Sequence, residues 1–214
     1  MTRRLHGLYV ITDGRHRDID DLTEKVAAAL RGGARLVQYR DKQHDPRRRL
    51  AEATALQALC ASQGVPLLIN DDIDLAVAVG AAGIHLGRDD QATQVARTRL
   101  PPGSLIGRSC YDRFELAQAA VTEQVDYVAF GSFFASPTKP EAVAAPLDLL
   151  HRARRELPVP VVAIGGITPE NGAALVDAGA SMLAVISAVF AAHDPTAAAR
   201  AFTPCFNSVE EYPP

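Results

Sequence analysis

The sequence is poor in the features that mark several classes of protein. It has 214 residues, no tryptophan, only 6% aromatic residues and three cysteines. The cysteines (Cys60, Cys110 and Cys205) are odd in number and show no CxxC spacing. This argues against a disulfide framework or a zinc site and favours a reducing, cytoplasmic environment. No apolar run approaches the roughly 18 residues of a membrane span, and the apolar stretch after the N-terminal arginines is too short for a signal peptide.

The chain also lacks a strong charge of either sign. With 22 basic and 25 acidic residues its formal net charge is −3, which argues against a general nucleic-acid binder. The hydrophobic content of 48% argues against disorder. A chain of this length is typical of one domain with a large core. We expect a catalytic domain over residues 1–203 and a C-terminal tail over residues 204–214.

Short apolar runs alternate with segments of helical spacing along the whole chain. Continuous apolar character, rather than alternation, is typical of strands that are buried on both faces. The predicted strands cover residues 8–12, 35–40, 66–70, 83–86, 105–109, 126–131, 160–166 and 182–187. The predicted helices cover residues 20–31, 47–62, 114–122, 147–156, 169–177 and 195–202.

Eight strand-helix units predict an α/β fold, a single-domain (β/α)8 TIM barrel. The alternative is an open doubly wound sheet, which usually carries a glycine-rich fingerprint after its first strand. The first predicted strand instead ends in Thr12-Asp13-Gly14, which is no such fingerprint. The barrel is therefore favoured.

Polar residues follow the apolar runs, where a barrel has its active site. Alternation along the second strand sends Gln38, Arg40 and Lys42 to one side. Lys139 is a third cation, and Asp71 and Asp90 are carboxylates on neighbouring loops. Cations beside a carboxylate pair indicate a polyphosphate bound with Mg2+, because this ion takes oxygen ligands from carboxylates and phosphates.

A second anion site is indicated by the loops after the last two predicted strands. Gly165-Gly166 and the turn at Ser187 lie where barrels commonly hold a phosphate on backbone N–H groups. Two phosphate sites on one rim imply two substrates or one bisphosphate.

Each of these residues also has a purely structural interpretation. Asp71, Asp72 or Asp90 could cap the helix that follows it, and Gly165-Gly166 could form only a tight turn. His85 is more typical of a core or supporting histidine than of a ligand. Ser109 has no histidine and aspartate arranged as a triad, which argues against a serine nucleophile.

Seven motifs together resemble those of the thiamine-phosphate synthase family. They are QYRDK at 38–42, NDD at 70–72, GIHLGRDD at 83–90, IGRS at 106–109, FGSFFASPTK at 130–139, VVAIGGI at 161–167 and AVISAV at 184–189. They occur in the family's order from about residue 8 to residue 202. The glycine pair is common to many phosphate-binding barrels, but the whole set is narrow.

The resemblance implies a role for each position. The pyrimidine diphosphate would be bound by Gln38, Arg40, Lys42, Asn70, Ser109 and Lys139, of which Arg40, Lys42, Ser109 and Lys139 would be catalytic. The thiazole phosphate would be bound by Ser136, Thr138, Gly166, Ile186 and Ser187. One Mg2+ ion per subunit would be held by Asp71 and Asp90.

The reaction implied by the resemblance joins 4-amino-2-methyl-5-pyrimidinylmethyl diphosphate to 4-methyl-5-(2-phosphoethyl)thiazole, or to its carboxylated form, and releases pyrophosphate. We infer a dissociative course from the chemistry of these substrates, with Mg2+ and the cations stabilising the leaving group. The sequence departs from the family at Ala135-Ser136, Arg88, Arg108 and Tyr111.

Two other functions are compatible with the same barrel. A thiazole tautomerase would need proton transfer, and Tyr111 stands where a histidine is common; with a pKa of about 10, tyrosine is a poor base at neutral pH. A non-catalytic module that senses thiamine precursors would not need both metal carboxylates. The expected partners are small molecules, with no nucleic acid and no membrane, and an alanine-rich helix ring is compatible with a homo-oligomer.

Overall fold

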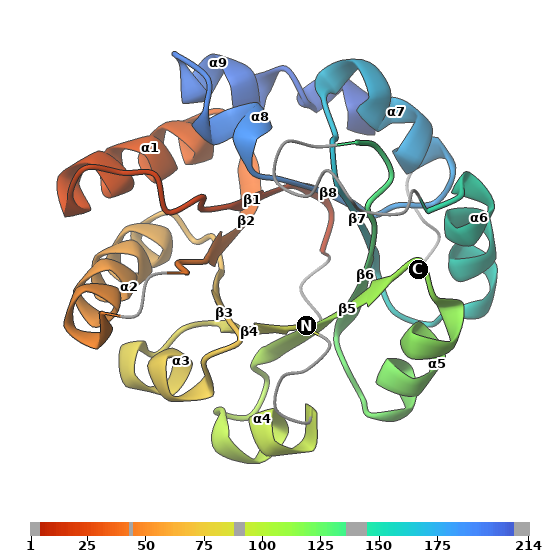
Figure 1. The fold of residues 1–214 in the computed structure, drawn as a ribbon, viewed down its shortest axis with the longest axis horizontal. Coiled ribbons are helices and arrows are strands. Elements are labelled where there is room, and N and C mark those ends of the chain that lie inside the picture. The colour runs from red at the N-terminus through yellow and green to blue at the C-terminus, as the bar shows by residue number, and fades with distance from the viewer. Residues whose placement is uncertain (1–4, 43–44, 88–92, 136–144, 208–214) are drawn as a thin grey trace.

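The structure, a computed structural model, describes residues 5–42, 45–87, 93–135 and 145–207. In these residues eight parallel strands form a closed barrel in which neighbours along the chain are also neighbours in space (Figure 1). The strands are β1 (Gly7–Ile11), β2 (Ala34–Tyr39), β3 (Leu67–Asn70), β4 (Gly83–Leu86), β5 (Leu105–Tyr111), β6 (Tyr127–Phe130), β7 (Val161–Ile164) and β8 (Met182–Val185). Parallel pairing of β1 with β8 closes the ring and excludes the open doubly wound sheet.

Helices surround the ring of strands on the outside (Figure 1). They are α1 (Ile19–Arg31), α2 (Pro46–Ser62), α3 (Ile73–Val79), α4 (Thr93–Arg99), α5 (Phe114–Thr122), α6 (Leu147–Glu156), α7 (Pro169–Asp177), α8 (Ser187–Phe190) and α9 (Pro195–Arg200). The predicted (β/α)8 barrel is therefore confirmed. The bounds of α5, α6 and α7 match the prediction, whereas α3, α4 and α8 were not predicted.

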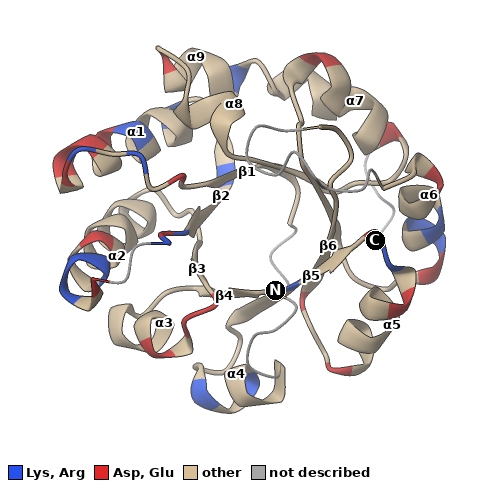
Figure 2. Ribbon diagram, viewed as in Figure 1, with Lys and Arg blue, Asp and Glu red and all other residues tan. Residues whose placement is uncertain are grey.

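Two apolar layers explain why the strands are apolar along their whole length. Inside the barrel, side chains such as Tyr9, Leu36 and Met182 form one buried cluster. Between strands and helices, side chains such as Val10 and Val37 form a second, larger cluster. Charged residues lie mainly on the helices and connecting segments, and the strands carry few (Figure 2). Successive residues of one strand thus pack alternately in the barrel interior and in the layer between strands and helices.

Aspartates mark the beginnings of several helices. The carboxylate of Asp72 accepts a hydrogen bond from the Leu75 N–H and so caps α3. Asp194 accepts from two backbone N–H groups and precedes Pro195 at the start of α9, as predicted. Side-chain acceptors at this position satisfy N–H groups that have no partner within the helix.

The chain differs from the prediction at the ends of two strands. The sequence predicts a last strand that extends to residue 187, but β8 ends at Val185 and Ser187 is the first residue of α8. Strand β5 is longer than predicted and ends at Tyr111, after an irregularity in its pairing with β6. Tyr111 has φ 57°, a conformation in which a strand cannot continue regularly.

The last described residues pack on the barrel. Thr203–Phe206 form a short 3-10 helix that contacts α7, and Cys205 is buried there. The Phe206 ring meets the His6 ring edge to face at 5.2 Å between centroids. Cys60, Cys110 and Cys205 are all unpaired and buried. Over the described parts of the chain, every helix is too short or too polar to span a lipid bilayer.

Candidate active site

The predicted site residues that the structure describes lie in the last residues of strands of the barrel or in the segments directly after them. Because all eight strands are parallel, their carboxyl ends face one rim. The structure describes nine of the predicted residues: Gln38, Arg40, Lys42, Asn70, Asp71, Ser109, Gly166, Ile186 and Ser187. The other four, Asp90, Ser136, Thr138 and Lys139, lie outside the described residues, so their predicted roles stay predictions.

The end of β2 shows the predicted alternation for Gln38 and Tyr39. Gln38 is 1% exposed and points into the barrel, where its amide nitrogen donates to the hydroxyl of Tyr9. Tyr39 points the other way and donates to Glu52 on α2 at 2.7 Å. This arrangement places the amide of Gln38 on the inner face, as the strand period requires.

Thr12, at the end of β1, fixes the backbone of Arg40. The Thr12 hydroxyl donates to the Arg40 carbonyl at 3.0 Å and accepts from the Arg40 N–H at 2.8 Å. Arg40 is half-buried and Lys42 is exposed. Thr12 ends the first predicted strand, residues 8–12, and is not among the predicted site residues. The pair of hydrogen bonds holds the start of the segment that carries both cations.

Asp71 and Asp72, adjacent at the end of β3, have different roles. Asp72 caps α3 and forms an ion pair with Arg49 at 3.0 Å. Asp71 has a left-handed backbone with φ 62°, and its carboxylate accepts from the Gly87 N–H at 3.0 Å and from the Asn70 amide at 2.5 Å. The capping interpretation therefore holds for Asp72, whereas the Asp71 carboxylate contacts the segment after β4.

Of the two predicted metal ligands the structure describes Asp71, whose carboxylate is an oxygen donor of the kind that Mg2+ prefers. Its two oxygens accept hydrogen bonds from the Gly87 N–H and from the amide nitrogen of Asn70. Gly87 connects this carboxylate to the segment that leads into residue 90, the other predicted ligand. Within the described residues, three or more His, Cys, Asp or Glu side chains do not gather into a metal-binding group.

Ser109 lies near the end of β5 and faces the barrel interior. Its hydroxyl lies 2.8 Å from Nε2 of His85, which is buried on β4. His85 is therefore a buried supporting residue, as predicted, and it contacts a predicted substrate-binding residue directly. The sequence does not predict this contact.

Gly165 and Gly166 follow β7 and contact the segment after β6. A Cβ on Gly165 would lie 1.9 Å from the Ser132 hydroxyl oxygen, and one on Gly166 would lie 2.5 Å from the carbonyl oxygen of Ala135. Both glycines have positive φ, 104° and 63°. The pair therefore forms a turn that only glycine permits, and this turn sits against residues 131–135, which lead into the predicted Ser136 and Thr138.

The end of β8 supplies the last two predicted residues. Ile186 is the residue before α8, and Ser187 is its first residue and is exposed. Helix α8 is a short additional helix between β8 and α9. In barrels of this kind, the loops after the seventh and eighth strands and such a helix commonly form a phosphate site.

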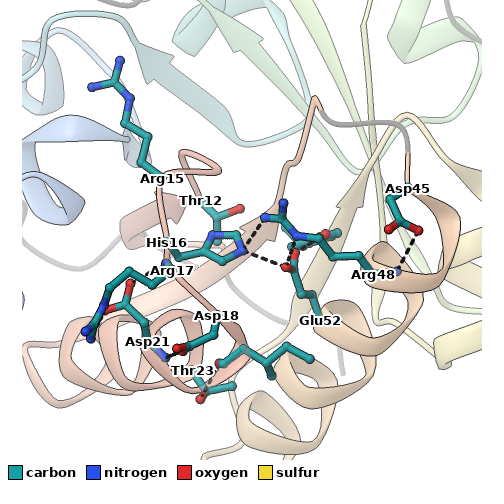
Figure 3. Close-up of polar contacts among 12 residues, drawn as sticks. Thr12, Arg15, His16, Arg17, Asp18, Asp21, Thr23, Asp45, Arg48 and Glu52 are labelled. Atoms are coloured by element: carbon teal, nitrogen blue, oxygen red, sulfur yellow. Dashed lines mark hydrogen bonds and ion pairs between the residues drawn. The ribbon is translucent and has the colours of Figure 1, made fainter.

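A buried ionic cluster lies between the outer face of β2 and helix α2, and the sequence does not predict it. Figure 3 shows the His16 ring and the Arg48 guanidinium converging on the carboxylate of Glu52. Glu52 Oε1 lies 2.6 Å from Arg48 Nε and 2.8 Å from His16 Nε2, while Tyr39 occupies Oε2. Burial acts to raise the pKa of Glu52, but these hydrogen bonds outweigh it and the pKa is lowered. The cluster joins the segment after β1 to α2 and strand β2.

Three known proteins and one family model resemble this chain over most of its length. The sequence model of a family described as thiamine monophosphate synthase matches residues 8–189. The thiamine-phosphate synthase of an Azoarcus species is 52% identical over 206 residues, which cover 96% of this chain and 100% of that protein. The corresponding protein of Thioalkalivibrio sulfidiphilus is 50% identical over 203 residues, covering 95% and 96%. The solved structure of thiamine phosphate pyrophosphorylase from Pyrococcus furiosus has a TM-score of 0.83 at 33% identity, covering 95% of this chain and 96% of that one.

Proposed function

The chain belongs to the thiamine monophosphate synthase family, and from this premise we propose that it is a transferase that joins a pyrimidinylmethyl diphosphate to a thiazole phosphate. The substrates are 4-amino-2-methyl-5-pyrimidinylmethyl diphosphate and 4-methyl-5-(2-phosphoethyl)thiazole or its carboxylated form. The observation that carries this proposal is the separation of roles at the end of β3. Asp72 caps the helix, and Asp71 presents its carboxylate beside Asn70 at the rim.

The diphosphate is bound by the residues that follow β2, β3 and β5. Gln38 and Asn70 contact the pyrimidine end, while Arg40, Lys42, Ser109 and Lys139 contact the diphosphate. Asp71 and Asp90 would hold one Mg2+ ion per subunit, which, when bound, supplies positive charge at the leaving group. The hydrogen bonds from Thr12 hold the Arg40 backbone in place before the substrate arrives. Such preorganisation makes charge stabilisation effective.

The reaction breaks the bond between the pyrimidine CH2 and the diphosphate oxygen, and the bonding electron pair leaves with the diphosphate. The 4-amino group delocalises the positive charge that remains on the CH2 carbon. Arg40, Lys42 and Lys139 stabilise the negative charge that grows on the leaving group. The thiazole nitrogen then donates its lone pair to the CH2 carbon and forms the new C–N bond. No protein nucleophile or strong base takes part.

The thiazole phosphate is bound on the other part of the rim by Gly166, Ile186 and Ser187, together with Ser136 and Thr138. The left-handed turn at Gly165-Gly166 supports this assignment because it packs against residues 131–135, which lead into Ser136 and Thr138. A monophosphate on backbone N–H groups and hydroxyls needs no metal ion.

The direct test is to incubate the full-length protein with both substrates and Mg2+. We expect thiamine phosphate and pyrophosphate in equal amounts, and no product when either substrate is omitted. Isomerisation of the thiazole without consumption of the diphosphate would instead indicate a tautomerase. Binding of both ligands without turnover would indicate a sensor.

Replacement of Ser187 by alanine tests the assignment of the two subsites. We expect the KM for the thiazole phosphate to rise about five- to tenfold, because one hydrogen bond to a charged phosphate is lost. The KM for the diphosphate should change less than about twofold. Ser181→Ala is the matched control, because Ser181 precedes the same strand at its opposite end. Weaker binding of the diphosphate alone would mean that the two subsites are reversed.

A further inference from the structure

Five polar side chains from five strands form one connected chain inside the barrel. The amide nitrogen of Gln38 donates to Tyr9 Oη, which lies 3.1 Å from Tyr127 Oη. Tyr127 Oη lies 2.8 Å from His85 Nδ1, and His85 Nε2 lies 2.8 Å from Ser109 Oγ. The four groups before Ser109 are all buried, with Tyr127 completely so. The chain thus connects a residue assigned to the pyrimidine with one assigned to the diphosphate.

The barrel interior has room for these five hydrogen-bonded side chains because β5 has a glycine beside the Tyr127 ring. Gly107 lies on β5 opposite Tyr127, and a Cβ there would lie 1.9 Å from the Tyr127 Cζ atom. Glycine within a strand commonly marks such a close approach. The Tyr127 ring also stacks on the His85 ring at 5.7 Å between centroids and meets the Tyr9 ring edge to face at 6.2 Å. The rings are therefore fixed by packing as well as by hydrogen bonds.

The number of available protons determines which group donates in each hydrogen bond between Gln38 and Ser109. Gln38 donates an N–H to Tyr9, so the oxygen of Tyr9 accepts and its own proton passes to Tyr127. Tyr127 then donates to Nδ1 of His85, and the neutral His85 ring carries its proton on Nε2 and donates to Ser109. The reverse direction with the same amide would leave the buried hydroxyl proton of Tyr9 without an acceptor in the chain, which is costly. With this direction, Ser109 accepts a hydrogen bond from His85, and its own O–H does not donate to any of the other four side chains.

We propose that Tyr9, Tyr127 and His85 are positioning residues that hold the Ser109 hydroxyl as a hydrogen-bond donor to the leaving diphosphate. This rests on the proposed function, since it assigns the direction of one contact in that reaction. A donor aimed at an oxygen where negative charge grows stabilises the transition state more than the bound substrate.

Burial keeps the two tyrosines protonated, so the direction of the hydrogen bonds from Gln38 to Ser109 is retained. Burial raises the pKa of Tyr9 and of Tyr127, so both phenols keep their protons at neutral pH. Gln38 sets the direction because its amide nitrogen can only donate. Its amide oxygen then remains as an acceptor for the exocyclic amino group of the pyrimidine. Binding of the pyrimidine thus favours the same amide orientation that makes Ser109 a donor.

A double-mutant cycle tests the connection. Tyr127→Phe and Ser109→Ala should each lower the single-turnover rate about tenfold, with the KM for the thiazole phosphate changed less than about twofold. The double variant should be no slower than the slower single variant, because both changes remove the same donor. Tyr39→Phe is the matched control: it also removes a buried, hydrogen-bonded hydroxyl, but from the outer face of β2. Its small effect should add to that of Ser109→Ala.

The second measurement is made on the wild-type protein without substrate, and a variant is used only to assign the resonances. In full-length protein labelled with 15N at histidine, the ring shifts of His85 should show the proton on Nε2; the resonances are assigned by their loss in His85→Gln. A proton on Nδ1 would reverse the chain and overturn the inference, as would additive effects of Tyr127→Phe and Ser109→Ala. If the wild-type protein forms no thiamine phosphate, the proposed function fails, and the role toward diphosphate fails with it. With an active wild type, a negative result counts against this inference alone.

Discussion

Replacement of Asp71 by asparagine should lower kcat at least about tenfold, which corresponds to roughly 1.4 kcal/mol or more of lost transition-state stabilisation. Asparagine tolerates the left-handed backbone at this position and keeps an oxygen for the Gly87 N–H, so the fold should be retained. What is removed is the negative charge that the proposed Mg2+ site needs. The measurement is the rate of thiamine phosphate formation at saturating substrates as a function of Mg2+ concentration. The variant should need more Mg2+ for half-maximal rate.

The neighbouring residue provides the matched control. Asp72→Asn removes one carboxylate charge from the adjacent position, where the side chain caps α3 and pairs with Arg49. Its side-chain oxygen can still accept from the Leu75 N–H, and asparagine is a good capping residue. We expect kcat within about twofold of the wild-type value and an unchanged Mg2+ requirement. Equal kinetics for wild type and Asp71→Asn would contradict the metal assignment.

The sequence was sufficient for the barrel because its signal is strong and local. The run GIHL and the helix at 147–156 lie where the pattern indicates, since burial on both faces requires apolar residues at every position. Helices α3 and α8 give weaker signals. The residues of α3, IDLAVAV, are almost all apolar and too few for helical spacing to be distinguished from a buried strand, and α8 has only four residues.

The buried polar chain could not be predicted from the sequence. Tyr9, His85 and Tyr127 lie inside apolar runs in which both faces of the strand are buried, so the period does not reveal which side chains face the interior. Their contact also depends on closure of the barrel, which brings together strands separated by up to 118 positions in the sequence. The rim residues were easier, because a polar residue directly after an apolar run is visible without knowledge of the fold. Asp71 and Asp72 show the limit of that signal, since only the backbone conformation decides which of them caps the helix.

Replacement of Glu52 by alanine should destabilise the protein by about 3 kcal/mol or more, because it breaks a buried ion pair from one side. Glu52 is 1% exposed, and its carboxylate forms hydrogen bonds with His16, Arg48 and Tyr39 (Figure 3). For a chain of this size the loss should lower Tm by roughly 6 to 12 °C, measured by thermal denaturation. The control is Glu156→Ala, which breaks an exposed pair with Arg152 and should cost at most about 0.5 kcal/mol. Similar Tm values for the two variants would mean that the buried cluster contributes no more than a surface pair.

The same carboxylate should make stability depend on pH in one direction. The folded pKa of Glu52 is lowered by its three hydrogen bonds despite the opposing effect of burial, whereas in the unfolded chain it is near the usual value of about 4.3. A lowered folded pKa contributes stability that is fully present above the unfolded pKa and is lost as the pH falls through the folded pKa. The difference in free energy of unfolding between wild type and Glu52→Gln should therefore be constant from about pH 6 to pH 8 and should shrink below about pH 4.3. A difference that instead grew on acidification would mean that protonation of Glu52 is favoured by folding, and that burial rather than the ionic contacts determines its charge.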